Sequence, residues 1–172
     1  MYKLVAIDID GTLMNDRKEI TKEVNDAIQA AKAKGVSVVI CTGRPIVGVQ
    51  SIIEELKLND EDDYVITFNG ALVQNTHTKE VESQITLTYE NLKEIYELSL
   101  KLDSPLHFFD TEHLYTPNRV ISTYTIHEAH INQVPLHYLP IDEVPKDMLI
   151  PKVMFIDEPE RLNHNIVNIL GN

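Results

Sequence analysis

The sequence is poor in the features of secreted and membrane proteins. It contains one cysteine, Cys41, and no tryptophan among its 172 residues. A single cysteine cannot form an internal disulfide, which agrees with a reducing compartment. No apolar run approaches the roughly eighteen residues of a membrane span, and the N-terminus leads into an apolar strand without a charged and apolar leader. We therefore expect a cytoplasmic globular protein.

Positive charge is also scarce. The chain carries 15 Lys and Arg residues against 27 Asp and Glu residues, which gives a net charge of -12 at pH 7. A nucleic-acid-binding surface needs clustered Lys and Arg side chains to neutralise backbone phosphates, so we expect no such partner. The same acidity gives no long-range attraction to a phosphate ester. Any anion must therefore be bound locally, by a metal ion, a helix N-terminus or a single arginine.

What the sequence does contain is an apolar run that ends on two carboxylates. Leu4–Ile9 is rich in aliphatic residues, as is typical of a parallel strand buried on both faces, and Asp8 and Asp10 stand at its carboxyl end. Side chains alternate along a strand, so both carboxylates are expected on the same side of it. That end of an open parallel sheet is where ligands bind.

This aspartate pair has three interpretations. A calcium loop needs acidic or amide side chains at its first, third and fifth positions and glycine at the sixth, but Thr12 and Leu13 occupy the last two. Two acids that only decorate a strand end would be an uncommon coincidence directly before Gly11 and Thr12. In the third interpretation Asp8 is a nucleophile that accepts a phosphoryl group, while Asp10 protonates the leaving oxygen and then activates water. Mg²⁺ would lie between Asp8 and Asp10, since it commonly binds one or two carboxylates plus a substrate phosphate.

A second predicted strand also ends on polar residues. Val36–Cys41 is followed by Thr42, Gly43 and Arg44, and Pro45 suits the first position of a helix. The Thr42 hydroxyl, the Gly43 amide and the helix N-terminus can all donate to phosphate oxygens, although an ordinary strand-to-helix turn has the same composition. Arg44 is either a substrate contact or a solvated surface group.

A third predicted strand, Tyr64–Phe68, leads into Asn69 and Gly70. From the residues alone, Asn69 and Gly70 are either a simple turn or part of a site. The acidic stretch Asn59–Asp63 before this strand is expected to be a solvated connection.

These segments together resemble the haloacid dehalogenase superfamily. The sequence DIDGTL at 8–13 is similar to the first signature of that superfamily. The segments CTGRP at 41–45, TFNGALVQ at 67–74 and KVMFIDEP at 152–159 extend the resemblance to Cof-type members, closest to the YidA-like sugar phosphatases. The family's third and fourth signatures, a lysine and a later acidic loop, are not found in these 172 residues, so the chain looks C-terminally truncated beside the family.

The resemblance assigns roles to specific positions. It implies a catalytic and metal-binding pair, Asp8 and Asp10. It implies phosphate binding by Ile9, Thr42 and Gly43. It also implies substrate contacts by Arg44, Asn69 and Gly70.

The expected fold is α/β. We predict a Rossmann-like parallel sheet core with three strands in residues 1–85, its later strands missing, and an incomplete α+β cap domain inserted after it in residues 86–172. The first strand lies centrally in such sheets, so one sheet edge would be unpaired here. Self-association, or pairing with a second chain through the exposed sheet, is therefore expected.

The function implied by the resemblance is that of a magnesium-dependent phosphatase. Its substrate would be a small phosphorylated metabolite, most simply a sugar phosphate, and it would act through an aspartyl-phosphate on Asp8. Two alternatives stay open. One is a phosphomutase, which passes the same phosphoryl group to a second hydroxyl. The other is an inactive fragment that keeps only the binding half of the fold.

Overall fold

The structure, a computed structural model, describes residues 2–170. The chain divides into two compact units, Met1–Ile85 and Thr86–Asn172. Residues 1, 171 and 172 of the predicted ranges lie outside the described residues. Among the described residues, none of the helices is both long enough and apolar enough to cross a membrane.

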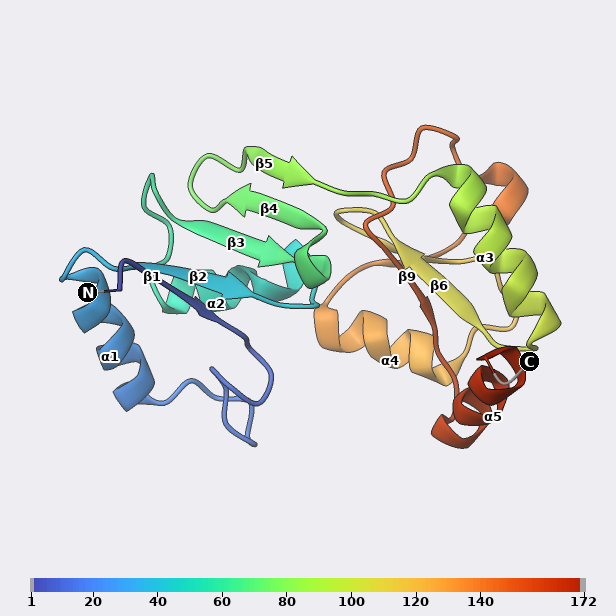
Figure 1. Cartoon of the computed structure of the whole chain (residues 1–172), viewed down its shortest axis with the longest axis horizontal. Coiled ribbons are helices and arrows are strands. Elements are labelled where there is room, and N and C mark those ends of the chain that lie inside the picture. Colours follow the sequence, from blue (N-terminus) through green and yellow to red (C-terminus); the bar gives the residue numbers. More distant parts are fainter. Residues whose placement is uncertain (1, 171–172) are drawn as a thin grey trace. The chain divides into compact units, whose positions relative to one another are not determined.

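The first unit is built on one five-stranded sheet (Figure 1). The strands lie in the order of the sequence, β1-β2-β3-β4-β5. The first three are parallel, which confirms the predicted parallel core, and the following hairpin joins the same sheet with antiparallel pairing. The strand bounds are Leu4–Ile7, Ser37–Cys41, Tyr64–Thr67, Leu72–Asn75 and Val81–Gln84.

Two helices contribute buried residues to the core of this unit: α1, Lys22–Lys32, and α2, Gln50–Glu55. The Thr21 hydroxyl caps α1 by accepting a hydrogen bond from the Val24 amide. Apolar residues of the helices and strands form one cluster, so one face of the sheet is covered. The buried members include Ile28, Val38, Ile40, Val49, Ile52, Ile53, Leu56 and Val65.

The prediction that the first strand is buried on both faces is wrong for the described chain. β1 pairs only with β2 and forms an edge of the sheet. Leu4 is 56% exposed and Val5 is 39% exposed. The apolar run is correctly identified as a strand, but burial depends on what packs beside it, and no described element of the first unit extends the sheet beyond β1.

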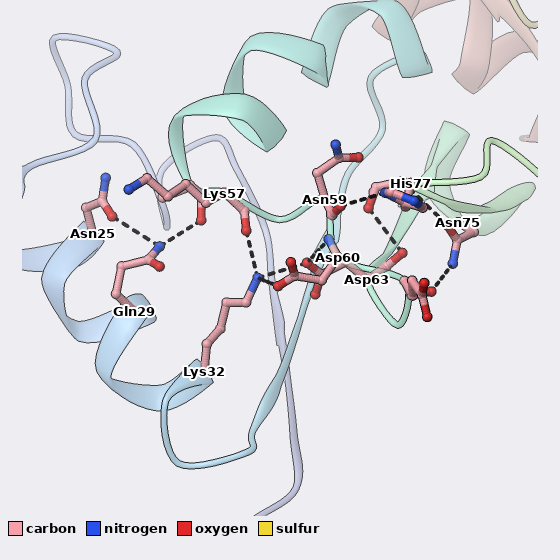
Figure 2. A network of polar contacts seen from close by, with 12 residues as sticks. Asn25, Gln29, Lys32, Lys57, Asn59, Asp60, Asp63, Asn75 and His77 are labelled. Carbon is pink, nitrogen blue, oxygen red and sulfur yellow. Dashed lines mark hydrogen bonds and ion pairs between the residues drawn. The ribbon is translucent and has the colours of Figure 1, made fainter.

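A polar network ties three segments together before β3 begins (Figure 2). The Lys32 ammonium at the end of α1 donates to Asp63 Oδ2 at 2.8 Å and to the carbonyl oxygen of Lys57 at 2.7 Å, and it also lies 3.0 Å from an oxygen of Asp60. The Thr76 hydroxyl, in the β4–β5 hairpin, donates to the Asp63 carbonyl at 3.1 Å. The predicted solvated connection is therefore partly internal, because Asp63 is buried.

The second unit has a four-stranded sheet in the order β8-β7-β6-β9. Its strands are Leu136–Tyr138, Leu114–Thr116, Leu106–Phe109 and Lys152–Phe155, and its helices are α3, Tyr89–Lys101, α4, Thr123–Asn132, and α5, Pro159–Leu170. The 3₁₀ segments within residues 2–170 are η1, Ile46–Val49, η2, Phe68–Gly70, and η3, Ile141–Glu143.

Helices cover both faces of this second sheet. Leu92 of α3 belongs to the same buried cluster as Leu106 and Phe108 of β6. His107 lies between those two residues, so its side chain points to the opposite face, where its Nδ1 lies 3.2 Å from the Thr125 hydroxyl of α4. The predicted α+β composition of this half agrees with the observed elements.

Candidate active site

The first loop of the site begins directly after β1. The Leu13 amide donates to the Asp8 carbonyl at 3.0 Å, and the Met14 amide donates to the Ile9 carbonyl at 3.0 Å. Ile9 is fully buried in the core of the first unit, and the turn that follows uses Gly11 at φ +78°. The burial of Ile9 fixes the backbone of this turn, and the flanking residues Asp8 and Asp10 are exposed at the surface.

The second and third loops are bonded to each other. The Asn69 amide donates to the Thr42 carbonyl at 3.0 Å, and the Phe68 amide donates to the Arg44 carbonyl at 3.1 Å. Phe68 and Asn69 have φ values of 52° and 58°, a left-handed conformation that costs energy for non-glycine residues. A Cβ atom added at Gly43 would lie 2.6 Å from Asn69 Oδ1, so only glycine fits this approach without a shift.

These three loops surround an open depression with a volume of about 390 Å³. Five of the predicted site residues line it, together with Cys41 and Ile66: they are Asp8, Thr42, Gly43, Asn69 and Gly70. All three loops follow the carboxyl ends of the parallel strands β1, β2 and β3. The position matches the edge at which open parallel sheets bind ligands.

Asp10 and Arg44, in contrast, bind each other. Arg44 Nε donates to Asp10 Oδ2 at 3.0 Å, and Arg44 Nη2 donates to Asp10 Oδ1 at 2.8 Å. Lys18 Nζ donates to the same Oδ1 at 2.9 Å. The hydrogen bond from Arg44 is the largest cause that lowers the pKa of Asp10 to about 2, against a smaller opposing effect of burial. Asp10 is thus held as a carboxylate by two cations.

Two residues beside this site were missed from the sequence. Lys18 lies eight positions after Asp10, in a loop without periodic pattern, and nothing in the sequence indicates that the loop folds back. Cys41, the single cysteine of the sequence, also lines the depression. Burial, and secondarily the negative charge of Asp8, raises the pKa of the Cys41 thiol, so it stays protonated at neutral pH.

The donor set of the depression suits a hard cation. Asp8 offers a carboxylate, which is the kind of oxygen ligand that Mg²⁺ prefers, and within residues 2–170 its side chain has no hydrogen bond or ion pair. Both oxygens of Asp10 are occupied by Arg44 and Lys18. Among the described residues, no group of three or more His, Cys, Asp or Glu side chains could hold a metal ion alone. Asp8 therefore fits a metal that takes its remaining ligands from substrate and water.

Parallel strands with polar loops gathered at their carboxyl ends are typical of the ligand-binding cores of α/β proteins. Within that class, the chain belongs to the haloacid dehalogenase-like hydrolases, because the model of that family matches residues 5–170. The phosphatase-like protein YxeH of Bacillus subtilis is 62% identical over 169 residues, which are 98% of this chain and 63% of YxeH.

Solved structures agree with the fold. A haloacid dehalogenase-like hydrolase from Bacteroides thetaiotaomicron superposes with a TM-score of 0.82 at 23% identity, over 98% of this chain and 63% of that protein. The subclass IIB sugar phosphatase BT4131 gives a TM-score of 0.72 at 24% identity, over 98% of this chain and 64% of that protein. The chain therefore spans less than two thirds of the length of these relatives.

Proposed function

We propose that the protein is a magnesium-dependent phosphatase of a small phosphorylated metabolite. The observation that carries the proposal is the position of Asp8, whose carboxylate lines an open depression together with Thr42, Gly43 and Asn69. A carboxylate nucleophile among neutral donors suits phosphoryl transfer, where catalysis consists mainly of alignment and charge stabilisation. Sugar phosphates are the first substrate class to test, since BT4131 is named as a sugar phosphatase.

In the proposed reaction an Asp8 oxygen attacks phosphorus, a new P–O bond forms, and the P–O bond to the leaving alcohol breaks. The leaving oxygen takes up one proton. Water then attacks the aspartyl-phosphate, which releases inorganic phosphate and restores Asp8. For Asp10 to deliver the proton, its carboxylate must first leave Arg44 and Lys18, because a carboxyl group with a pKa of about 2 is ionised at neutral pH and has no proton to donate.

The phosphate donors come from side chain and backbone rather than from a helix N-terminus. The sequence predicts a helix that opens at Pro45, but the structure places the 3₁₀ segment Ile46–Val49 there, before the short helix α2. The Thr42 oxygen accepts a hydrogen bond from the Arg44 amide at 3.2 Å, so the hydroxyl proton of Thr42 remains available to an anion. Thr42 and the backbone amides of the depression are thus the proposed oxyanion donors.

Asp8 and Asp10 are the residues that would hold Mg²⁺, Asp10 after exchange of its cation partners. The ion would supply positive charge that neutralises the phosphoryl oxygens as they develop charge. The protein's own residues set the position of the phosphoryl group in front of Asp8. The single cysteine and the reducing compartment that it indicates support a cytoplasmic location for this activity.

Product analysis tests this proposal. The chain, and a version extended with the C-terminal third of a YxeH-like relative, are incubated with a ³²P-labelled hexose monophosphate and Mg²⁺. We expect inorganic phosphate and a labelled enzyme intermediate that is lost in the Asp8→Asn variant, while Asp16→Asn, in the neighbouring turn, retains both. An isomeric sugar phosphate as the product would instead identify a phosphomutase. Turnover by the extended version alone would identify the 172-residue chain as an inactive fragment.

A further inference from the structure

Lys18 owes its place beside Asp10 to a well-defined turn. The Lys18 amide donates to the Asn15 carbonyl at 2.9 Å, and the Asn15 amide donates to the Glu19 carbonyl at 3.1 Å. The Asn15 side chain closes the turn by accepting from the amides of Arg17 and Glu19 at 2.9 and 3.1 Å. Lys18 itself has φ +61°, a left-handed conformation that an L-residue adopts only when its surroundings impose it.

Both ends of this turn are anchored in the core of the first unit. Leu13 is buried, and Met14 and Ile20 pack against the same apolar cluster. The turn is therefore held in one position, which places the Lys18 ammonium beside the Asp10 carboxylate. A surface lysine that served only solubility would need neither the anchors nor the strained backbone.

Lys18 and Arg44 together have the geometry of an anion site. Arg44 grips the Asp10 carboxylate with two parallel hydrogen bonds, the fork by which arginine binds either a carboxylate or a phosphate. Lys18 adds a point charge on one of the two oxygens. The Arg44 backbone is continuous with Gly43 and is bonded to Phe68, so this pair stands at the rim of the depression that holds Asp8.

The bond between Asp10 and this pair can be displaced. The side chain of Lys18 is 64% exposed and that of Asp10 is 45% exposed. An exposed ion pair such as Lys18–Asp10 contributes only about 0–1 kcal/mol, because water screens it and the side chains lose entropy. The bidentate pair with Arg44, whose side chain is 23% exposed, is the stronger of the two. A phosphate group with up to two charges and several acceptor oxygens competes well with one carboxylate at such a site.

We propose that Lys18 and Arg44 form an anion-binding pair at the rim of the candidate active site, that Asp10 occupies this pair in the free protein, and that the phosphoryl group of the substrate displaces Asp10 from it. The inference rests on the proposed function for the nature of the anion. It assigns a binding role to Lys18 and gives Asp10 a second role, that of an internal stand-in for substrate. Release of Asp10 is then coupled to arrival of the phosphoryl group.

Binding of inorganic phosphate, measured by calorimetry in EDTA without turnover, tests this displacement. Asp10→Asn removes the competitor, so we expect the dissociation constant of phosphate to fall about 3- to 10-fold, and Lys18→Met removes a partner, so we expect it to rise by a similar factor. In the double variant, Asp10→Asn with Lys18→Met, we expect Asp10→Asn to lower the logarithm of the phosphate dissociation constant by less than half as much as it does alone. The reason is that the cation that Asp10→Asn would free is no longer present.

Matched variants separate displacement from simple charge. Asp16→Asn removes the same charge from the same turn, and Lys22→Met removes an exposed lysine whose partner is Asp26. Equal effects of Asp10→Asn and Asp16→Asn, strict additivity with Lys18→Met, or no phosphate binding by the wild type at tens of millimolar would each overturn the inference. If the phosphatase assay failed while the Asp10 and Lys18 variants bound phosphate as expected, only the proposed function would be rejected.

Discussion

At the scale of single residues, Gly43 shows how one missing side chain shapes the site. A Cβ atom there would lie 2.6 Å from Asn69 Oδ1, closer than real Cβ atoms approach. We expect Gly43→Ala to displace the Asn69 side chain and to lower the free energy of unfolding by about 1 kcal/mol, the usual cost of mild overpacking. Thermal unfolding of Gly43→Ala measures this cost.

The Asn69→Ala background is the control for that steric mechanism. With Asn69 truncated, the added methyl group at residue 43 has space, so the second substitution should cost little. An equal loss of stability in both backgrounds would mean that backbone conformation, and not the contact with Asn69, requires glycine.

His107 is the second residue with a specific expected behaviour. It is fully buried, and its burial, with a smaller contribution from the positive charge of Lys152, lowers the pKa of its imidazole from 6.5 to about 4. The unfolded chain binds this proton more tightly than the folded chain, so stability falls as pH drops below 6.5 and stops falling near pH 4. From the two pKa values, we expect His107 to cost the fold about 2 kcal/mol between pH 7 and pH 5.

Urea unfolding followed by circular dichroism at pH 7 and pH 5 measures this dependence. His107→Gln, which can keep a hydrogen bond to Thr125, should flatten the pH profile, whereas His130→Gln, on an exposed position of α4, should leave it unchanged. A profile for His107→Gln as steep as that of the wild type would contradict the assignment.

At the scale of secondary-structure elements, the network of Figure 2 holds the end of α1 against the segment before β3. The Lys32 and Asp63 side chains are only 17% and 8% exposed. Lys32→Met would leave the Asp63 carboxylate buried without its cation, so we expect the free energy of unfolding to fall by about 2–3 kcal/mol. The exposed pair of Lys22 and Asp26 is the matched control, and Lys22→Met should cost under about 0.5 kcal/mol.

Chemical denaturation of both lysine variants checks this difference. In the double variant Lys32→Met with Asp63→Asn, part of the loss should return, because no uncompensated buried charge remains. Equal stability of Lys32→Met and the wild type would show that the network adds no stability.

At the scale of the whole molecule, the open edge of β1 is the feature with the clearest consequence. An edge strand with exposed Leu4 and Val5 presents unpaired backbone groups and apolar surface together. We expect the 172-residue chain to pair with a second copy through this edge, with an apparent mass that rises with protein concentration. Light scattering coupled to size exclusion measures it.

Leu4→Lys should weaken this association, since lysine on an edge strand opposes pairing. The control is Val120→Lys, which changes an 88% exposed residue of the second unit and should leave the association intact. A wild-type chain that stays monomeric over a hundredfold range of concentration would refute the pairing.

The sequence by itself determined where the main elements and the depression would form. Apolar runs located β1, β2 and β3 to within a residue or two, because strand formation follows local pattern. The polar residues that follow those strands were bound to meet, since parallel strands bring their carboxyl ends to one edge. This is why Asp8, Thr42, Gly43 and Asn69 line one depression, as their order in the chain predicts.

Only the tertiary structure decided which charges pair and which surfaces are covered. Arg44 and Lys18 both donate hydrogen bonds to Asp10, although Lys18 is eight residues away in the sequence. Asp63 is buried and accepts a hydrogen bond from Lys32, although it belongs to an acidic stretch. Burial of β1 depends on its neighbours and not on its composition. The partners of long flexible side chains and of strand edges depend on which groups lie close together in the folded chain. The local sequence pattern does not specify which distant residues those are.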